Sequence, residues 1–225
     1  MLYYRQGEAT LVRLMLGKSV QQQVKLGVSI LKRGGLVAFP TDTVYGLGAS
    51  ANVPQAVERV YMVKKRPPNM ALPLLLADIS QISEVAEPVP PIVWLLADKF
   101  LPGALTIVLP KSKSVSDIIT AGGMTVAIRV PAHPVPVALA RGSGAPIVGT
   151  SANLSGKPSA LTADEVKSQF GDEVDLVIDG GRCPGGKAST VVDVTGETPT
   201  ILREGAVSEE ELRGVCGNIV LRQGG

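Results

Sequence analysis

The amino-acid sequence predicts a single domain of the mixed α/β class. Short β-branched runs alternate along its 225 residues with segments whose apolar residues recur at helical spacing, a pattern typical of strands and helices in alternation. Hydrophobic residues make up 45% of the chain and charged residues 19%, which favours a buried core over intrinsic disorder. Because no repeat or low-complexity linker interrupts the pattern, we expect one domain over residues 19–217. An extension at 1–18 and a tail at 218–225, each an additional strand or a loose end, would flank it.

In the first half of the chain, glycine and proline mark where the expected helices begin and end. Proline fits the first turn of a helix, where the N–H groups have no partner within the helix, and further along it stops the helix. The expected elements are a helix capped by Ser19, a strand over 36–39, a helix from Pro54, a strand over 72–76 and a helix from Pro91 to Phe100. Pro73 favours an edge position for the strand over 72–76, because proline has no N–H to donate.

In the second half, two helix starts carry a recognisable signal. Thr162 with Glu165, and Ser208 with Glu211, have the spacing of a capping box, so we expect helices to begin at both places. The remaining expected elements are a short helix over 135–140 and strands over 105–109, 125–130, 145–149, 174–179, 190–194 and 200–202.

The composition excludes several classes of protein. The single histidine, His133, rules out a multi-histidine zinc site, and a structural turn explains it as well as a Ser-His-Asp triad does. Aromatic residues at 4% and a net charge of +2 argue against a surface that stacks RNA bases. The longest apolar runs are far shorter than a bilayer span. Cys183 and Cys216 stand in unrelated contexts and no export signal is recognisable, so we expect a reduced, cytoplasmic protein with no membrane partner.

Two polar segments stand where the predicted sheet would place a ligand. Segment 40–48 combines glycines with hydroxyl groups and a phenol, although an Asp-containing turn explains it equally well. Segment 149–156 follows an expected strand, and Ser151 and Asn153 would point to the same side if the chain is extended there. A hydroxyl-rich turn is the alternative interpretation of that segment.

A pair of cations, Lys64 and Arg66, ends the helix that starts at Pro54. Their simplest role is to complement the helix dipole at a surface. The alternative is that both converge on a polyphosphate, because lysine supplies a point charge and arginine a planar fork of donors. The spacing alone favours the simpler role.

Two further cations, Arg129 and Arg203, each end an otherwise apolar strand. A buried arginine at such a position needs an anionic partner. Asp42 or Glu204 would make that partnership structural, whereas a ligand carboxylate or phosphate would make it functional. Together with the hydroxyl-rich loops, these cations indicate an anionic, nucleotide-like ligand.

The glycine-rich segment 180–190 comes close to a phosphate-binding P-loop. We reject that interpretation for two reasons. Ala188 stands where the magnesium-binding hydroxyl belongs, and an expected strand from Thr190 follows where a P-loop requires a helix. A flexible loop that delivers Ser189 to a site remains open.

At these same positions the chain resembles the YrdC-like family, the threonylcarbamoyl-AMP synthases of tRNA t6A biosynthesis. The resemblance covers residues from about Val20 to Val215 in one order and spacing, which makes it far more specific than any one motif. The matching segments are PTDTVYGLG at 40–48, the K-x-R of Lys64 and Arg66, PGALTIVL at 102–109, TVAIRVPAHP at 125–134, SAN at 151–153, ASTVVDV at 188–194 and ILREGAV at 201–207.

The resemblance implies a fold, a reaction and a set of partners. The fold would be an open, twisted mixed α/β sheet with a basic concave ligand cleft, in the single-domain form of the family. The reaction would convert L-threonine, bicarbonate and ATP into threonylcarbamoyl-AMP and pyrophosphate, with Mg²⁺ arriving on the nucleotide. The unstable product would pass to a separate threonylcarbamoyl transferase complex, and tRNA binding by the chain itself stays open.

The resemblance also assigns residues, carried over motif by motif. Threonine would be held by Thr41, Arg129, Gly149 and Ser189, with Arg129 pairing the carboxylate. ATP would be held by Tyr45, Lys64, Arg66, Thr125, Ser151, Asn153, Ser159 and Arg203. Of these, Lys64, Arg66, Ser151 and Asn153 would carry catalysis, which needs positioning and cationic stabilisation more than a general base.

One departure from the family keeps alternatives open. Many members have a threonine-contacting histidine in the strand after K-x-R, where this chain has the apolar Leu74-Leu75-Leu76. A paralogue that adenylates another carbamoyl compound therefore remains an alternative. A non-catalytic RNA-binding module is the other, because a basic concave surface can hold a phosphate backbone.

Overall fold

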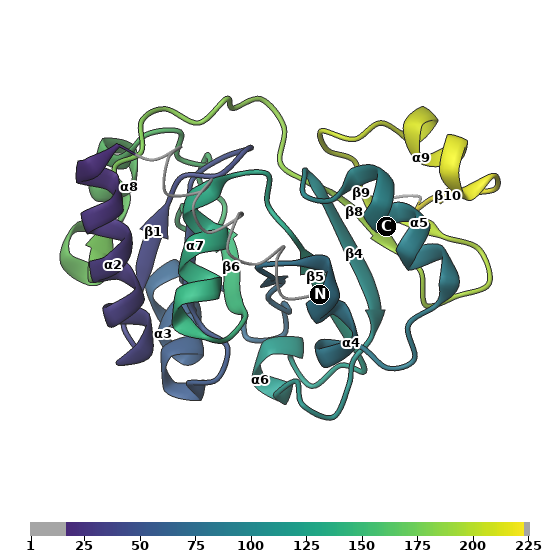
Figure 1. The fold of residues 1–225 in the computed structure, drawn as a ribbon, viewed down its shortest axis with the longest axis horizontal. Helices are drawn as coiled ribbons and strands as arrows, with labels where there is room; N and C mark the ends of the chain where they lie inside the picture. The colour runs from purple at the N-terminus through teal and green to yellow at the C-terminus, as the bar shows by residue number, and fades with distance from the viewer. Residues whose placement is uncertain (1–16, 223–225) are drawn as a thin grey trace, which may run out of the picture.

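The computed structural model describes residues 17–222, which form one ten-stranded sheet with helices on both faces (Figure 1). The strands are β1 (Val37–Phe39), β2 (Gly46–Ser50), β3 (Leu74–Leu75), β4 (Leu105–Pro110), β5 (Thr125–Arg129), β6 (Ile147–Ser151), β7 (Leu176–Val177), β8 (Thr190–Asp193), β9 (Thr200–Arg203) and β10 (Val220–Leu221). Their order across the sheet is β10-β9-β8-β4-β5-β3-β6-β2-β1-β7.

The sheet is mixed, as the sequence predicts. Parallel pairs join β1 to β7, β3 to β5, β4 to β8 and β9 to β10. The other neighbours run antiparallel. Of the two alternatives for the C-terminal tail, a strand or a loose end, Val220–Leu221 form a strand. Of the extension predicted at 1–18, only Gly17 and Lys18 lie within the described residues.

The α-helices are α2 (Lys18–Lys32), α3 (Pro54–Lys64), α4 (Ile82–Val85), α5 (Pro91–Phe100), α6 (Asp117–Thr120), α7 (Pro134–Ser143), α8 (Ala163–Phe170) and α9 (Glu209–Cys216). Short 3₁₀ turns, η1 (Ile79–Gln81) and η2 (Gly171–Glu173), precede α4 and follow α8. Within residues 17–222, every helix is too short or too polar to cross a membrane.

Two hydrophobic clusters lie on opposite faces of the sheet. The larger one joins α3, α5, α8 and α9 to alternate strand residues such as Leu47, Ile107 and Ile128. The smaller one joins α2 and α7 to Phe39, Leu75 and their neighbours in β1, β3 and β6. This alternation is the period-two pattern of a strand that is buried on both faces.

The α2–α7 layer covers only half of its face of the sheet. In Figure 1, both helices lie over the β1 and β6 end. Among the described residues, none from β5, β4, β8 or β9 belongs to the smaller cluster. On the α2–α7 side, we call these four strands the open half of the sheet. Its apolar residues Val108, Ala127 and Val191 are only partly buried.

Most helix starts predicted from the sequence are confirmed. Pro54 and Pro91 open α3 and α5, and the side chains of Thr162 and Ser208 cap α8 and α9. The N-cap predicted at Ser19 is wrong: α2 begins at Lys18, and its cap position, Gly17, makes no side-chain bond.

Two strand predictions are corrected. Residues 46–48, the end of the polar segment expected to be a loop, belong instead to strand β2, which is paired on both sides by β1 and β6. The strand after Pro73 does not lie at an edge, because β3 stands between β5 and β6. Pro73 itself directly precedes the two residues of β3, and its carbonyl accepts a hydrogen bond from the N–H of Gly149.

The cap of α9 gives a direct test of local stability. Ser208 accepts the N–H of Glu211, and the Glu211 carboxylate accepts the N–H of Ser208. We expect Ser208→Ala to lower the free energy of unfolding by about 1 kcal/mol, because the N–H of Glu211 loses its side-chain acceptor. Ser116→Ala is the matched control, since Ser116 occupies the cap position of α6 without a side-chain bond. Urea denaturation of the two variants would contradict the assignment if they lost equal stability.

Candidate functional site

One row of side chains crosses the open half of the sheet. Leu75 of β3 pairs with Arg129 of β5, and the register of β4 with β5 brings Thr106 next to Arg129. Thr106 pairs in turn with Val191 of β8, which pairs with Arg203 of β9. Cross-strand neighbours point to the same face of a sheet. Arg129, Thr106 and Arg203 therefore share the face that α2 and α7 leave uncovered.

Arg129 is held at one end of this row by three acceptors. Its Nη2 donates to Asp42 Oδ1 at 2.7 Å, its Nε to the Gly103 carbonyl at 2.9 Å and its Nη1 to Thr43 Oγ1 at 3.3 Å. The side chain of Arg129 is 9% exposed and that of Asp42 15%. Of the anionic partners that the sequence leaves open, the structure selects Asp42.

Thr41 lies beside this cluster. Its hydroxyl donates to the Val44 carbonyl at 2.7 Å and lies 3.0 Å from Thr43 Oγ1, which in turn contacts Arg129. The backbone N–H of Thr41 donates to Cys183 Sγ at 3.4 Å. The turn that begins at Pro40 is thus tied both to the guanidinium and to the glycine-rich segment after β7.

Ser189 and Arg203 form a second cluster, at the other end of the row. Arg203 Nη2 donates to the Ser189 carbonyl at 2.8 Å and to Ser189 Oγ at 3.2 Å. Ser189 Oγ also lies 2.8 Å from Thr106 Oγ1, and Ser189 and Thr106 are both buried. The sequence assigned no role to Thr106, although a hydroxyl within the apolar run of 105–109 was a signal for one.

Lys64 builds the third cluster, at the end of β6. Its ammonium donates to the backbone carbonyls of Ser151 at 2.5 Å and Asn153 at 2.6 Å, and its own carbonyl accepts the N–H of Ser155. Lys64 is 2% exposed. Burial, assisted by the nearby charge of Arg66, lowers the pKa of Lys64 to about 8. The lysine therefore fixes the backbone of the segment that carries Ser151 and Asn153.

The side chain of Asn153 leaves one polar atom unsatisfied. Its Nδ2 donates to the carbonyls of Leu154 and Lys157, whereas Oδ1 is buried and finds no hydrogen-bond donor among residues 17–222. A buried acceptor without a donor is costly and is uncommon outside functional sites. This atom lies in the segment held by Lys64, which marks the segment as one that a ligand could complete.

Electrostatic interactions link the three clusters. Burial lowers the pKa of Arg203, and the positive charges of Arg129 and Arg66 lower it further. Arg66 in turn lowers the pKa of Lys64. When neighbouring cations destabilise each other's charged form, an anion bound between them stabilises those charged forms. Arg66 itself is braced by the Met70 and Ala71 carbonyls.

Four other predicted residues lie outside these clusters. Tyr45 is fully buried, its phenol donates to the Gly181 carbonyl at 2.9 Å, and burial raises its pKa to about 12. Thr125 lies on β5, four residues before Arg129 and so on the same face. Ser159 is half-buried in the loop before α8. Gly149 lies on β6, where a Cβ would collide with the buried side chain of Leu75.

Leu75, in the strand where the family resemblance led us to expect a histidine, has two neighbours in the candidate site. It pairs with Arg129 and packs over Gly149, two residues predicted to hold threonine. It is 7% exposed. The side chain of Leu75 therefore presents an apolar surface next to the guanidinium of Arg129.

His133 and the glycine-rich segment take structural roles. His133 caps α7, its Nδ1 accepting the N–H of Val135 at 3.2 Å, which agrees with the structural interpretation of this histidine. Residues 181–186 lead into strand β8 and not into a helix, as the rejection of a P-loop requires. A bond from Gly185 N to the Thr43 carbonyl holds this segment against the turn at 41–45, and a bond from Cys183 N to the Leu161 carbonyl holds it against the loop before α8.

The described residues contain no group of three or more histidine, cysteine or acidic side chains arranged to hold a metal. The carboxylate of Asp42 is committed to Arg129.

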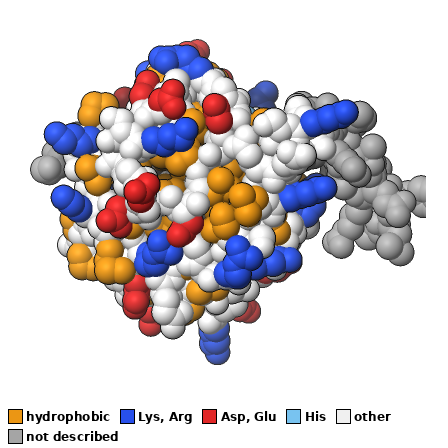
Figure 2. All heavy atoms as spheres, turned by 90° about the vertical axis from the view of Figure 1, so that its left-hand side faces the viewer, with side chains coloured by type: hydrophobic (Ala, Val, Ile, Leu, Met, Phe, Trp, Pro, Cys, Tyr) orange, Lys and Arg blue, Asp and Glu red, His pale blue; other side chains and the backbone are white. Residues whose placement is uncertain are grey.

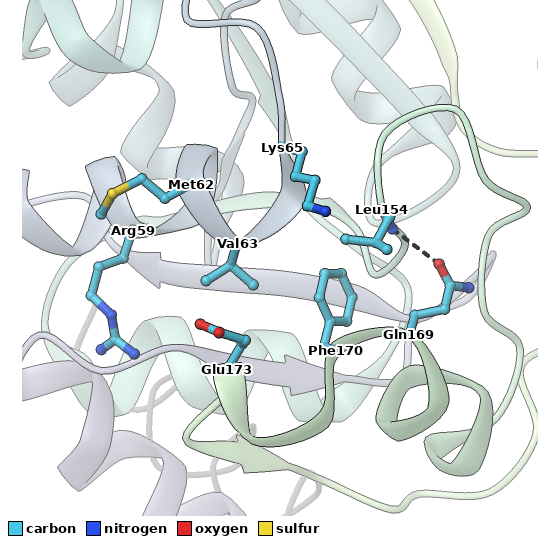
Figure 3. Close-up of a pocket in the computed structure, with 8 residues that line it drawn as sticks. All are labelled: Arg59, Met62, Val63, Lys65, Leu154, Gln169, Phe170 and Glu173. Carbon is cyan, nitrogen blue, oxygen red and sulfur yellow. Dashed lines mark hydrogen bonds between the residues drawn. The ribbon is translucent and has the colours of Figure 1, made fainter.

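A pocket of about 410 Å³ lies elsewhere, between α3 and the C-terminal end of α8 (Figure 3). Val63, Leu154 and Phe170 point toward one another at its centre, with charged side chains at its margin. None of the predicted site residues lines it, although Val63 and Leu154 adjoin Lys64 and Asn153 in the chain. The side of the molecule seen in Figure 2 mixes basic and acidic side chains and shows no continuous basic patch there.

Comparison with known proteins gives consistent matches. Residues 29–205 match the Sua5_yciO_yrdC family profile, whose description is "Telomere recombination". The threonylcarbamoyl-AMP synthases of Pyrococcus abyssi and Bacillus subtilis are each 42% identical to this chain, over 88% and 90% of its length. The chain spans only 58% and 59% of those two relatives. The crystal structure of P. abyssi Sua5 complexed with L-threonine superposes with a TM-score of 0.86, over 88% of this chain and 58% of that one, at 42% identity.

Proposed function

The chain belongs to the Sua5/YciO/YrdC family, and from that premise we propose that it is an L-threonylcarbamoyladenylate synthase. It would make threonylcarbamoyl-AMP and pyrophosphate from L-threonine, bicarbonate and ATP, in the cytoplasm, for the t6A modification of tRNA. The observation that carries the proposal is that Lys64 holds the Ser151–Asn153 segment, Arg129 is paired with Asp42 and Arg203 bonds to Ser189, in a chain that is 42% identical to threonylcarbamoyl-AMP synthases. A magnesium ion would enter with ATP, and a threonylcarbamoyl transferase complex would consume the product.

The proposed chemistry has two balanced steps. The amine of threonine combines with bicarbonate to give a carbamate and water. A carbamate oxygen then attacks the α-phosphorus of ATP, forming one P–O bond while the bond to the departing pyrophosphate breaks. Negative charge grows on phosphate oxygens in the second step, so fixed cations lower its barrier without a general base.

The three clusters divide this work between them. The guanidinium of Arg129 suits the planar carboxylate of threonine, and Thr41 and Ser189 lie on either side of it. Arg66 and Arg203 suit the polyphosphate, and Lys64 holds the segment of Ser151 and Asn153 that would receive the nucleotide. Holding both substrates side by side would supply most of the rate enhancement.

The decisive experiment is pyrophosphate release by the purified protein with L-threonine, bicarbonate and Mg-ATP. We expect release to require all three substrates and to fall to background in the Lys64→Ala variant. Pyrophosphate release should be much slower when L-serine or carbamoyl phosphate is supplied in place of L-threonine. Equal release from carbamoyl phosphate would instead support a paralogue with another substrate, and salt-sensitive tRNA binding without any turnover would support an RNA-binding module.

A further inference from the structure

Asp42 makes the shortest contact to the guanidinium of Arg129. Its Oδ1 lies 2.7 Å from Nη2, and the partner side chains are only 9% and 15% exposed. A buried guanidinium without an anionic neighbour would be unfavourable, so Asp42 already supplies the counter-charge in the ligand-free protein. The motif match assigned Thr41 to the site but gave no role to the residue after it.

The bonds to Arg129 leave a specific set of donors free. A guanidinium has five N–H donors in one plane. Gly103 takes the one on Nε, Asp42 takes one on Nη2 and Thr43 takes one on Nη1. Within the part of the chain that the structure describes, one donor therefore remains on each terminal nitrogen, an arrangement that suits the two oxygens of a single carboxylate.

The three acceptors come from two elements that are independent of β5. Asp42 and Thr43 belong to the turn before β2, and Gly103 follows α5. Because acceptors on both elements fix the same plane, the orientation of the guanidinium is set before any ligand arrives. A preorganised donor pair binds more tightly than one that must be ordered on binding.

We propose that Asp42 is a positioning residue that orients Arg129 for the α-carboxylate of the amino-acid substrate. The proposal rests on the function proposed above and adds to it the determinant of carboxylate recognition. The proposal predicts the direction in which the affinity for threonine changes. Removing Asp42 weakens threonine binding, even though it also removes a negative charge that would repel the substrate carboxylate.

The test is the affinity for L-threonine, measured by isothermal titration calorimetry with and without a non-hydrolysable ATP analogue. For Asp42→Ala we expect the Kd for threonine to rise tenfold or more, while the Kd for the analogue stays within twofold. Asp42→Asn keeps an acceptor oxygen but not the charge, so we expect a smaller rise of a few fold. L-threoninamide, which has no carboxylate, should bind the wild type and Asp42→Ala equally weakly.

Two controls separate positioning from simple loss of a salt bridge. Asp117→Asn removes the acidic partner of Lys111 at an exposed position and should leave threonine binding unchanged. In an Arg129→Gln background, Asp42→Ala should cause no further loss, because a residue that acts through Arg129 has nothing left to orient. An additive loss in that background would assign Asp42 a contact of its own and overturn the proposal.

The outcomes also separate this proposal from the proposed function. If the wild type binds threonine and Asp42→Ala or Asp42→Asn binds it equally well or more tightly, Asp42 is only a competing charge and the inference fails alone. If the wild type binds no threonine, the proposed function fails. Should Asp42→Ala not fold, the sign of the change in Asp42→Asn decides the question.

Discussion

Replacing Lys64 by methionine is expected to lower the rate of pyrophosphate release at least 100-fold and to loosen residues 151–155 before any nucleotide binds. Methionine keeps most of the buried volume of lysine but has no N–H donor. The carbonyls of Ser151 and Asn153 accept from the ammonium at 2.5 and 2.6 Å, and both bonds would be lost. The Ser151 carbonyl would keep the N–H of Asn153 as a donor, whereas the carbonyl of the buried Asn153 would lose the ammonium, and a buried acceptor left unsatisfied costs about 1–3 kcal/mol.

Hydrogen exchange in the nucleotide-free protein is the informative measurement. Faster exchange of the amides of Ala152 and Ser155 in Lys64→Met would establish that the lysine works by holding the backbone. Those two amides bond to the carbonyls of Tyr45 and Lys64 in the wild type. Unchanged exchange together with lost activity would mean that Lys64 acts only on the nucleotide. Lys65→Met, at an exposed neighbouring position, is the control and should behave like the wild type.

Gly205→Ala is expected to have the largest effect on stability, a loss of about 3 kcal/mol or more. A Cβ at Gly205 would overlap backbone atoms of Ala188, Ser189 and Thr190, and backbone cannot swing aside as the end of a side chain can. Residues 205–207 lie against residues 188–190, at the start of β8, through bonds from Ala206 N to the Ala188 carbonyl and from Thr190 Oγ1 to the Val207 carbonyl. Displacing residues 188–190 would also move Ser189 away from Arg203.

The control for this prediction lies nine residues further along. Gly214, within α9, has open space where its Cβ would be, so Gly214→Ala should be neutral or stabilise the protein by up to about 1 kcal/mol. In thermal and urea unfolding, the midpoint should therefore fall for Gly205→Ala and stay the same or rise for Gly214→Ala. Comparable losses in both would show that the close approach at Gly205 is relieved at little cost.

The elements that could be predicted from the sequence are those with a strong local signal. Proline at the first turn located α3 and α5, and the capping-box spacing located α9. Strand β2 was missed because Gly46, Leu47 and Gly48 have little intrinsic preference for extended backbone. Its pairing with two neighbours decides the outcome, and a Cβ at Gly48 would meet the Val148 carbonyl of β6.

The sequence predicted which residues belong to the candidate site, but not which partners each side chain contacts. Motif matching assigned Lys64, Arg129 and Ser189 to it, but partners far apart in sequence decide what each side chain does. Nothing local to Lys64 indicates that its ammonium faces two carbonyls nearly ninety positions later. Thr106 was missed for a similar reason, because its role depends on the register of β4 with β8.

The strand order has a consequence for synthesis of the protein. β4 is complete by residue 110, but its parallel neighbour β8 begins only at Thr190 and β9 only at Thr200. A growing chain emerging from the ribosome must therefore carry β4 with a bare hydrogen-bonding edge while some eighty more residues are made. Unpaired edges invite pairing with other chains, and such distant contacts form slowly. We expect this interval, and not the finished fold, to be the point at which the protein is most prone to aggregate and most dependent on chaperones.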